Sequence, residues 1–504
     1  MEFLNDVNFV EVGTIALVVL ISFLIGRVFF DRKRVSDYPP AIPGLPLIGN
    51  LLQLKAKKPH QTFAKWAELY GPIYSIKTGA TTLVVLNTAE VAKEAMVAKF
   101  SSISSRKLSN ALTILTADKS MVAMSDYGDF HKMVKRNILK IILGPSAQKR
   151  NHHLRETMID SMLSQLHAYI KENALQAVNL RVVFKRELFK LALRQALGKD
   201  IESIYVGELG KCLSQSEIFD ILVVDPMMGA IEVDWRDFFP YLRWVPNKPV
   251  EEKIHQMAYR RSAVTRALIQ NQKKRIDGGE KVDCYLDFLL SETKMLTEEQ
   301  LTMLVWEAII ETSDTTLVTT EWAMYELAKN PECQDRLYQE IRGVCGSEKV
   351  TENHLPQLPY LSAIFHETLR KHSPVPIIPP RYVHEDTQLG GYKIPAGTEI
   401  AINIYGCNMD KKEWDHPEEW KPERFVEKPN ETMDLHKTMS FGGGKRSCAG
   451  ALQAMLISCS AIGRFVQDFE WRLKEGEEEN EDTVQLTTHK LKPMLAFLTP
   501  RGKK

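Results

Sequence analysis

The sequence predicts a mainly α-helical fold (α+β) with a few small β-sheets, preceded by a single N-terminal transmembrane helix. Apolar residues recur at helical spacing through most of the chain, whereas β-branched runs are few and short. The chain has 504 residues, of which 44% are hydrophobic and 26% are charged. This composition is ordinary for a globular protein, so a mainly disordered chain and a polytopic membrane protein are both excluded.

The N-terminal segment predicts a membrane anchor. Residues 1–11 form an acidic tail, and residues 12–30 form an apolar run of about 19 residues, or roughly 28 Å of helix, which nearly spans a hydrocarbon core of about 30 Å. Basic residues follow at 27–34, so the positive-inside rule places the rest of the chain in the cytosol. A cleaved signal peptide is expected to begin with basic residues, and we therefore predict an uncleaved single-pass anchor.

A basic flank and proline-rich hinge, residues 31–50, connects the anchor to one large cytosolic domain, residues 51–504. The prolines at positions 39, 40, 43 and 46 keep the backbone extended and exclude helix. The hinge is therefore expected to be stiff and to set the angle between anchor and domain.

Within the domain, the periodicity predicts one β-hairpin, a series of helices and a few short strands. The hairpin joins β-branched runs at residues 72–77 and 81–86 through a turn that contains Gly79. Helical patterns cover residues 88–100, 130–143, 151–172, 182–197, 250–275, 359–372 and 449–467. Residues 391–404 predict two short strands joined by a Pro-Ala-Gly turn, and short strands close the chain.

The longest helical pattern runs over residues 297–329, where Gln300 is placed to complete a capping box with Thr297. At about 50 Å, this helix is long enough to cross the core of a large domain. Its hydroxyl groups form a stripe with i, i+3, i+4 and i+7 spacing at Thr312, Thr315, Thr316 and Thr319. Threonines that bond to the i−4 carbonyl bend a helix and open a local groove. The stripe predicts either such a groove or a set of satisfied surface threonines.

Charge and cysteine usage exclude several classes of function. Lys and Arg total 65 against 64 Asp and Glu, a net charge of +1, which argues against a protein that works mainly by nucleic-acid electrostatics. The 7 Cys are widely spaced with no Cys-x-x-Cys pair, so a disulfide framework and a cysteine-rich zinc site are poorly supported. A reducing compartment fits best.

One cysteine is set apart by its neighbours. The segment reads Phe441-Gly-Gly-Gly-Lys-Arg-Ser-Cys-Ala-Gly450, a glycine turn followed by a predicted helix. The glycines let the backbone approach whatever the Cys448 sulfur holds, and the helix dipole is expected to favour thiolate over thiol. A single thiolate on such a loop suits the axial position of a haem iron. A buried structural Cys would not need the surrounding Phe, Gly and Arg, and Arg446 after Lys445 excludes a usual phosphate loop.

This pattern resembles that of the cytochrome P-450 family of haem-thiolate monooxygenases. The matching positions are Phe441, Gly444, Arg446, Cys448 and Gly450. The resemblance implies the cytochrome P-450 fold and a haem b whose iron is ligated by Cys448. It also implies that Phe441, Arg446 and Gly450 line the cofactor, that O2 is a co-substrate, and that electrons come from NADPH through an NADPH–cytochrome P-450 reductase.

By the same resemblance, Glu311-Thr-Ser-Asp314-Thr315 is the oxygen-activation segment of the long helix. It implies that Asp314 and Thr315 form a catalytic acid–alcohol pair that relays protons to the haem site. The sequence departs from the family here, because Glu311 and Thr312 replace a small residue and a glycine.

A structural charge network is also implied by the resemblance. Glu367 and Arg370 stand at i, i+3 on a predicted helix, and Arg424 lies in Pro422-Glu-Arg-Phe425. Such pairs are ordinarily exposed and weak. The resemblance instead implies a buried network, in which loss of one member leaves an uncompensated charge and costs about 3–5 kcal/mol.

The haem propionates are expected to meet basic residues at two places. His131, Lys132 and Lys135 occupy the positions where the family usually offers Trp-Arg and a second basic residue. Arg381, in Pro379-Pro-Arg381, resembles the second propionate partner. A solvated basic helix face remains the alternative for the first set.

Residues 235–246 are dense in aromatic side chains. Two interpretations are equally compatible with the sequence: plain core packing, or a surface loop that dips into the membrane interface near the substrate entrance.

Three segments point to one group within the cytochrome P-450 family. They are residues 127–135, 235–246 and 307–329, and they are similar in sequence to the ent-kaurene oxidase family of plants. This resemblance implies successive oxidations of one methyl group of ent-kaurene, through alcohol and aldehyde, to ent-kaurenoic acid in gibberellin biosynthesis. A hydrocarbon of this kind has no polar handle, so an apolar pocket must orient it by shape.

Two other functions remain open at this stage. One is the oxidation of a related labdane-type diterpene in a defence pathway, and the other is a haem-thiolate protein that binds ligand without oxidising it. The resemblance implies a body facing the cytosol at the endoplasmic reticulum, with the plastid outer envelope as the alternative. The expected partners are the reductase, a diterpene hydrocarbon and membrane lipid, and no nucleic acid.

Overall fold

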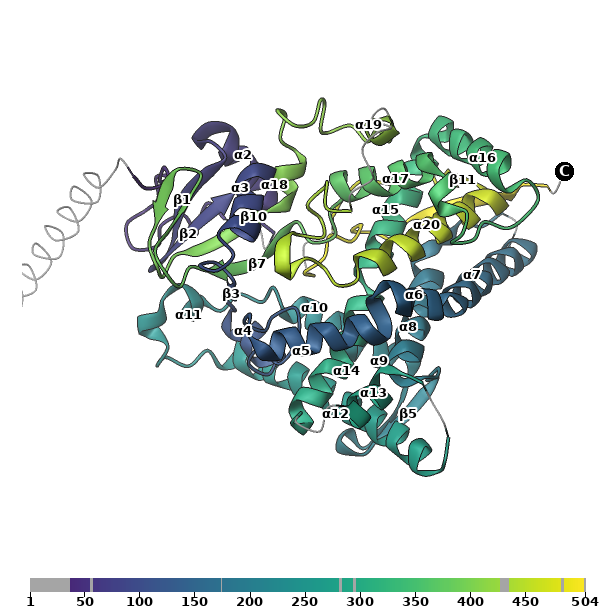
Figure 1. Ribbon diagram of the computed structural model, residues 1–504, viewed down its shortest axis with the longest axis horizontal. Helices are drawn as coiled ribbons and strands as arrows, with labels where there is room; N and C mark the ends of the chain where they lie inside the picture. Colours follow the sequence, from purple (N-terminus) through teal and green to yellow (C-terminus); the bar gives the residue numbers. More distant parts are fainter. Residues whose placement is uncertain are drawn as a thin grey trace, which may run out of the picture.

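The computed structural model describes residues 37–54, 58–173, 175–280, 283–292, 296–426, 435–481 and 485–502. Figure 1 shows a β-rich end, with α2, α3 and α18 beside the strands, and a larger helix-rich part crossed by α14 and α15. The apolar run at residues 12–30 lies outside the described residues. Within the described ranges, no helix is both long enough and apolar enough to cross a membrane.

Helices make up most of the chain. The α-helices are α2 His60–Tyr70, α3 Ala89–Lys93, α4 Asn110–Leu115, α5 Asp129–Ile138, α6 Pro145–Arg150, α7 His152–Glu172, α8 Leu180–Leu197, α9 Gln215–Phe219, α10 Asp225–Gly229, α11 Trp235–Phe238, α12 Lys248–Asp277, α13 Tyr285–Glu292, α14 Glu298–Ser313, α15 Thr315–Lys329, α16 Pro331–Cys345, α17 Pro359–Lys371, α18 Ile404–Asn408, α19 Glu423–Val426 and α20 Ala451–Asp468. Short helical turns complete them: η1 Glu94–Ala98, η2 Leu139–Leu143, η3 Gly207–Leu209, η4 Asp220–Val224, η5 Pro240–Leu242, η6 Leu355–Gln357 and η7 Gly444–Arg446.

The strands are short and form four small sheets. They are β1 Ile73–Thr78, β2 Thr81–Leu86, β3 Ser105–Arg106, β4 Val178–Asn179, β5 Ser203–Val206, β6 Lys211–Ser214, β7 Ile377–Tyr382, β8 Thr387–Leu389, β9 Tyr392–Ile394, β10 Glu399–Asn403, β11 Phe469–Leu473 and β12 Leu495–Pro500. The largest sheet has the order β1-β2-β10-β7-β3, and the others are β11-β12-β4, β5-β6 and β8-β9. In the largest sheet only the β2–β10 pair is parallel.

The predicted hairpin is confirmed, with Ile73 opposite Leu86 and Thr78 opposite Thr81. The two strands expected between residues 391 and 404 are present as β9 and β10, but they do not pair with each other. β9 pairs with β8, and β10 is inserted between β2 and β7. A chain segment can enter a sheet only where backbone partners are free, which a local sequence pattern does not record.

The proline-rich segment lies against this sheet. Ile42 donates a backbone hydrogen bond to Ser75 at 2.9 Å, and Ser75 donates one to Pro40 at 2.8 Å. The segment thus follows the edge strand β1 in an extended conformation, as its prolines require.

The core has two large apolar clusters that meet along the central helices. One gathers α15, α17 and α20, with Trp322, Phe365 and Phe465 among its fully buried side chains. The other gathers α8, α12 and α14 around residues such as Phe189 and Leu304. α15 contributes to the first cluster and α14 to the second, and Figure 1 shows both helices in the helix-rich part of the molecule.

The predicted single helix at residues 297–329 is in fact two helices. The capping box of Thr297 and Gln300 is confirmed, but α14 ends at Ser313 and α15 begins at Thr315. Asp314 between them has φ −123° and ψ −62°, outside the helical region, and the Ser313 hydroxyl donates to the Ile309 carbonyl at 2.5 Å. The hydroxyl bonding that we expected to open the helix is therefore present on both sides of the break, from Ser313 before it and from Thr319 of the threonine stripe, which donates to the Thr315 carbonyl at 3.1 Å.

Two other predicted helices are also interrupted. The patterns at residues 88–100 and 130–143 each continue into a π-helical turn, η1 and η2, after the α-helix ends. Such turns insert one residue into the helical repeat and re-aim the chain that follows.

The aromatic segment at residues 235–246 is not core. Its residues Trp235, Phe238 and Phe239 are only half-buried, while Tyr241 is 58% exposed and Trp244 is 79% exposed. The core-packing interpretation is therefore wrong. The Phe238 carbonyl accepts a hydrogen bond from Ala80 at 2.8 Å, which places the segment beside the β1–β2 turn (Figure 1).

Candidate functional site

The Cys448 loop has the backbone conformation that its glycines allow. Gly442 and Gly444 both have φ of 66°, and a Cβ on Gly444 would lie 2.5 Å from the Met96 carbonyl oxygen. The Cys448 amide closes the loop by donating to the Phe441 carbonyl at 2.9 Å. Any other residue at Gly444 would be strained and would clash with backbone, so this loop requires glycine there.

The start of α20 faces the Cys448 sulfur. The amides of Gly450 and Ala451 and the charge of Lys135 each act to lower the thiol pKa, but burial and the nearby Glu311 carboxyl outweigh them and raise it to about 11. The start of the helix therefore favours the thiolate as expected, but the surrounding protein and Glu311 outweigh this effect in the chain by itself. The helix lowers the cost of the thiolate, and a bound metal cation would have to displace the proton.

Lys135 supports this loop from α5. Its Nζ donates to the Lys445 and Ser447 carbonyls, both at 2.9 Å, and burial lowers the pKa of its ammonium group. Lys132 lies on the outer face of the same helix, more than half exposed, with Asp129 at 3.5 Å. The structure thus brings Lys135, but not Lys132, to the cysteine loop.

Three buried arginines gather next to this loop. Arg106 on β3 stands directly opposite Arg381 on β7, and Arg446 precedes Cys448 by two residues. Arg106 donates to the Ala123 carbonyl at 3.1 Å and the Pro379 carbonyl at 2.8 Å, and Arg446 donates to the Ser125 carbonyl. Like charges directly opposite in a sheet repel each other.

No carboxylate of the described residues lies within ion-pairing distance of these guanidinium groups. The pKa of Arg106 is lowered by burial and then by Arg381 and Arg446, and the pKa of Arg381 is lowered to about 10 by burial and Arg446. Arg381 Nε and Nη1 and Arg446 Nε are buried without a hydrogen-bond partner in the described chain. Buried cations of this kind need an anion, and haem propionates supply two carboxylates.

His131 completes this cluster as a neutral group. Burial, followed by Arg446 and Lys135, lowers its pKa to about 4. Its Nδ1 lies 3.0 Å from the Ser125 hydroxyl, and its Nε2 is buried without a partner among the described residues. It can therefore offer a hydrogen bond but no positive charge. The donor set and its position beside Cys448 fit a haem.

Asp314 is held from the far end of the chain. Its Oδ1 lies 2.7 Å from His489 Nε2, and its Oδ2 accepts from the Thr487 hydroxyl at 2.7 Å. Burial alone would raise the pKa of Asp314, but His489 and Thr487 lower it below its ordinary value. Thr315 is half-buried, and none of the described residues hydrogen-bonds to its hydroxyl. Asp314 and Thr315 are adjacent in the chain, but among the described residues only the Asp314 side chain is held by hydrogen bonds.

Two neighbouring carboxyls, the buried Glu307 and the exposed Glu311, lie earlier on α14. Glu307 accepts hydrogen bonds from the Val122 and Ala123 amides at 2.8 and 2.9 Å, and it is 1% exposed. Glu311 lies beside it. The surrounding protein atoms raise the pKa of both carboxyls, and for Glu307 the charge of Glu311 adds to the effect.

The structural charge network is brought together with full burial. Arg370 donates to both oxygens of Glu367 at 2.7 Å, and Arg424 Nε donates to Glu367 at 3.3 Å. Arg370 and Glu367 are 0% exposed. Arg370 also donates to the carbonyls of Asn408, Pro417 and Glu419, so the network ties α17 to the segment before the cysteine loop.

Sequence reasoning missed Arg106, Glu307 and His489. Arg106 lies in a two-residue strand, and His489 meets Asp314 across 175 positions of sequence. Glu307 carried a local signal, since a charged residue in the middle of a wholly apolar helix is rarely buried without a specific partner.

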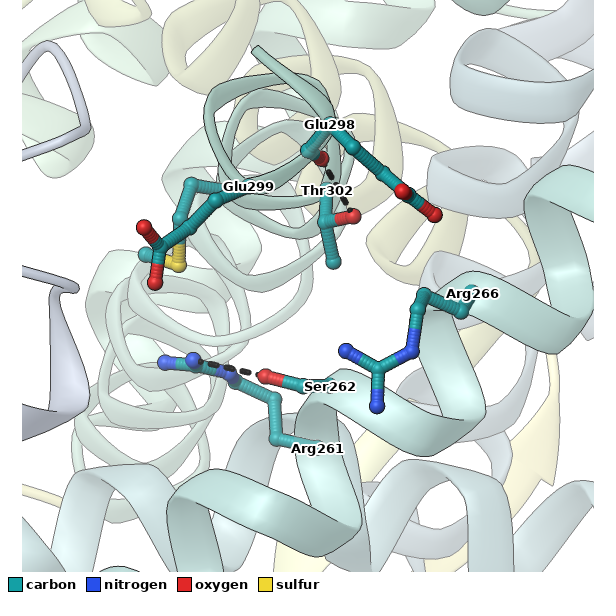
Figure 2. A pocket seen from close by; sticks show the side chains of 7 residues that line it. Arg261, Ser262, Arg266, Glu298, Glu299 and Thr302 are labelled. Carbon is teal, nitrogen blue, oxygen red and sulfur yellow. Dashed lines mark hydrogen bonds between the residues drawn. The ribbon is translucent and has the colours of Figure 1, made fainter. Parts of the chain in front are cut away.

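Figure 2 shows a surface pocket of about 470 Å³ between α12 and the first turns of α14. It is lined by Arg261, Ser262, Arg266, Glu298, Glu299, Thr302 and Met303. Charged side chains of both signs face it, so it offers no apolar wall for a hydrocarbon. It is separate from the cysteine loop, and we assign it no part in the chemistry.

Comparisons with known proteins agree with this geometry. Residues 39–497 match the family model described as cytochrome P450. The chain is 64% identical to ent-kaurene oxidase 2 of Oryza sativa subsp. japonica over 94% of each chain. It is 57% identical to ent-sandaracopimaradiene 3-hydroxylase of the same rice, over 93% of this chain and 92% of the relative. A solved zebra fish cytochrome P450 structure with abiraterone shares the fold, with a TM-score of 0.71 and 21% identity over 88% of this chain and 99% of that chain.

Proposed function

The chain belongs to the cytochrome P450 family and is a monooxygenase, and we propose that it oxidises one methyl group of ent-kaurene in successive steps to ent-kaurenoic acid. The observation that carries this proposal is the 64% identity, over 94% of both chains, to a relative named ent-kaurene oxidase 2. The fold and the site support the reaction type, and the likeness supports the substrate. We place the reaction in gibberellin biosynthesis on the same ground.

In the proposed mechanism, Cys448 holds the haem iron, and haem supplies the oxygen-activating chemistry when it is bound. Arg106, Arg381 and Arg446 bind its propionates, with His131 as a neutral hydrogen-bond donor. The unpartnered guanidinium nitrogens support this assignment. The amides of Gly450 and Ala451 stabilise negative charge on the sulfur.

Asp314 and Thr315 deliver protons in this proposal. Because Asp314 is bound to His489 and Thr487, its carboxylate has a fixed position next to the break between α14 and α15. Thr315 lies at the same break with a free hydroxyl, so it is placed to pass on a proton that Asp314 receives. His489 is thus a positioning residue for the acid.

We propose that the enzyme works at a membrane surface, with its body facing the cytosol. A polycyclic hydrocarbon partitions into lipid, and the exposed Tyr241 and Trp244 would insert at the interface beside the substrate entrance. The N-terminal anchor at residues 12–30 would hold the chain at the endoplasmic reticulum. Electrons would come from NADPH through the membrane-bound reductase.

A second candidate function is the oxidation of a related diterpene in a specialised pathway. The 57% identity to ent-sandaracopimaradiene 3-hydroxylase supports it, because a protein this similar carries a name with a different substrate and position. The two candidates share the site and differ only in the fit of the hydrocarbon.

The test is an incubation of the full chain with reductase, NADPH and each of a panel of diterpene hydrocarbons, followed by product identification. The proposal expects ent-kaurene to give alcohol, aldehyde and acid in sequence. Turnover of ent-sandaracopimaradiene with ent-kaurene left unchanged would establish the second candidate instead. A Cys448→Ser chain is the matched control and should give no product.

A further inference from the structure

Glu311 stands out on α14. Every residue from Leu301 to Ser313 is buried except Glu311, whose side chain is exposed. The helix that carries it, α14, lies in the helix-rich part of the molecule (Figure 1). Cys448 is exposed as well, and the charge of Glu311 is close enough to raise the pKa of its thiol. The Glu311 carboxyl on α14 and the Cys448 sulfur on the cysteine loop are therefore both accessible to solvent and close enough to interact electrostatically.

The carboxyl of Glu311 is held in place by its neighbours. Glu307, one turn earlier, is fixed by the amides of Val122 and Ala123 and lies beside Glu311. The protein atoms around the pair disfavour the charged forms and raise the pKa of both carboxyls, although the Glu311 side chain is accessible to solvent, so the pair readily retains a proton. Tyr285 adds a hydroxyl near both, and this hydroxyl is buried with no partner in the described chain.

A carboxyl at this position cannot form a hydrogen bond with a hydrocarbon substrate. An apolar substrate gains nothing from it, and its burial costs free energy. The first product of a methyl oxidation, however, carries a hydroxyl on the carbon that faces the reactive centre. Among the residues of this helix, Glu311 is the one that offers that hydroxyl a charged or protonated partner.

We propose that Glu311 is a specificity-determining residue that hydrogen-bonds the hydroxyl of the first oxidation product and retains it for the next oxidation. The inference rests on the proposed function and deepens it by explaining how one site performs several steps.

The test measures binding and does not depend on turnover. The haem-loaded full chain is titrated with ent-kaurene, the corresponding alcohol and the corresponding acid, and the change in haem absorption gives each Kd. For Glu311→Leu we expect a Kd for the hydrocarbon that is unchanged or lower, and a Kd for the alcohol that rises roughly tenfold. Glu311→Gln retains a hydrogen-bonding group and should restore most of the alcohol affinity.

Glu299→Leu is the control, because it removes an exposed carboxyl from the first turn of the same helix. It should leave all three Kd values unchanged. Hydrocarbon binding by each variant shows that the variant is folded and loaded. An alcohol Kd that is the same in Glu311→Leu and in the unmodified chain would overturn the inference.

The outcomes also separate this inference from the proposed function. If the unmodified chain binds neither ent-kaurene nor its alcohol, the proposed substrate is wrong, and Glu311 as the selector of that alcohol is wrong with it. If ent-kaurene binds and the alcohol does not depend on Glu311, the substrate stands and only the role of Glu311 fails.

Discussion

At the scale of single residues, the site is defined by groups that lack partners. Arg381 and Arg446 keep buried donors that no described residue satisfies, and His131 has a neutral ring with a free nitrogen. The sequence pointed to Arg381, Arg446 and Cys448 through the family resemblance. It could not reveal Arg106, because its role depends on a strand pairing that only the fold creates.

The unpaired cations predict effects of opposite sign in the haem-free and haem-loaded chains. Arg381→Met removes one of three mutually repelling charges, so the free energy of unfolding of the haem-free chain should stay the same or rise by about 1–4 kcal/mol, and its unfolding temperature should not fall. The same change should speed haem loss by roughly tenfold or more, since a charge-assisted hydrogen bond is lost. Thermal unfolding and haem transfer to a scavenger protein measure the two effects.

Arg136→Met is the control for this comparison, because Arg136 lies exposed on the outer face of α5. It should change neither quantity. A haem-free Arg381→Met chain that is clearly destabilised, with haem retention unchanged, would show that Arg381 is a structural residue and not a propionate partner.

His489 predicts a shift in pH dependence. His489 lowers the pKa of Asp314, so His489→Gln should raise it, and Asp314 then takes up its proton at higher pH. The acid limb of the pH–activity profile should therefore move to higher pH. Product formed per NADPH consumed should fall at the same time, since the acid is less well positioned.

His255→Gln, at an exposed position on α12, should leave the profile unchanged. An acid limb that stays in place in His489→Gln would mean that His489 does not control Asp314.

At the scale of elements, periodicity predicted where helices lie but not where they are interrupted. The break at Asp314 depends on Thr487 and His489, which reach it from the C-terminal segment. The sequence analysis did not predict α2 and α16. The turn between β9 and β10 also did not indicate that each strand pairs with a different partner. In each case a long-range contact decided the outcome, and a local pattern does not contain that contact.

The charge network predicts a large loss of stability from one substitution. Arg370→Met leaves the 0% exposed Glu367 without its main partner, so the free energy of unfolding should fall by about 3–5 kcal/mol. Denaturant unfolding of the haem-free chain measures it.

The partly exposed pair of Arg336 and Glu423, at 2.7 Å, provides the comparison. Arg336→Met should cost less than about 1 kcal/mol. Equal costs for the two substitutions would show that the Glu367 network gains nothing from its burial.

At the scale of the whole molecule, the fold places a membrane-facing candidate surface beside the β-rich end. Tyr241 and Trp244 are exposed and follow α11, which lies next to the β1–β2 turn and far from β5 in Figure 1. The N-terminal anchor remains a prediction from sequence. The single large domain expected after it, residues 51–504, is also a prediction from sequence.

This surface predicts membrane binding that does not depend on the anchor. A chain lacking residues 1–34 should still associate with phosphatidylcholine vesicles, and Trp244→Ser should weaken that association roughly tenfold, since a large apolar side chain no longer inserts. Flotation of the vesicles measures the bound fraction. Tyr205→Ser, at an equally exposed aromatic on β5, should have no effect, and equal losses from both changes would contradict an oriented surface.

The central claim is that the Cys448 sulfur ligates a haem iron held by the buried arginines. The most direct measurement is the absorption spectrum of the reduced, carbon-monoxide-bound chain, recorded for the unmodified protein, Cys448→Ser and Cys459→Ser. The account predicts the thiolate-type band in the unmodified chain and in Cys459→Ser, where a buried cysteine of α20 is replaced. Cys448→Ser should lose that band, and a thiolate-type band that persists in Cys448→Ser would contradict the account.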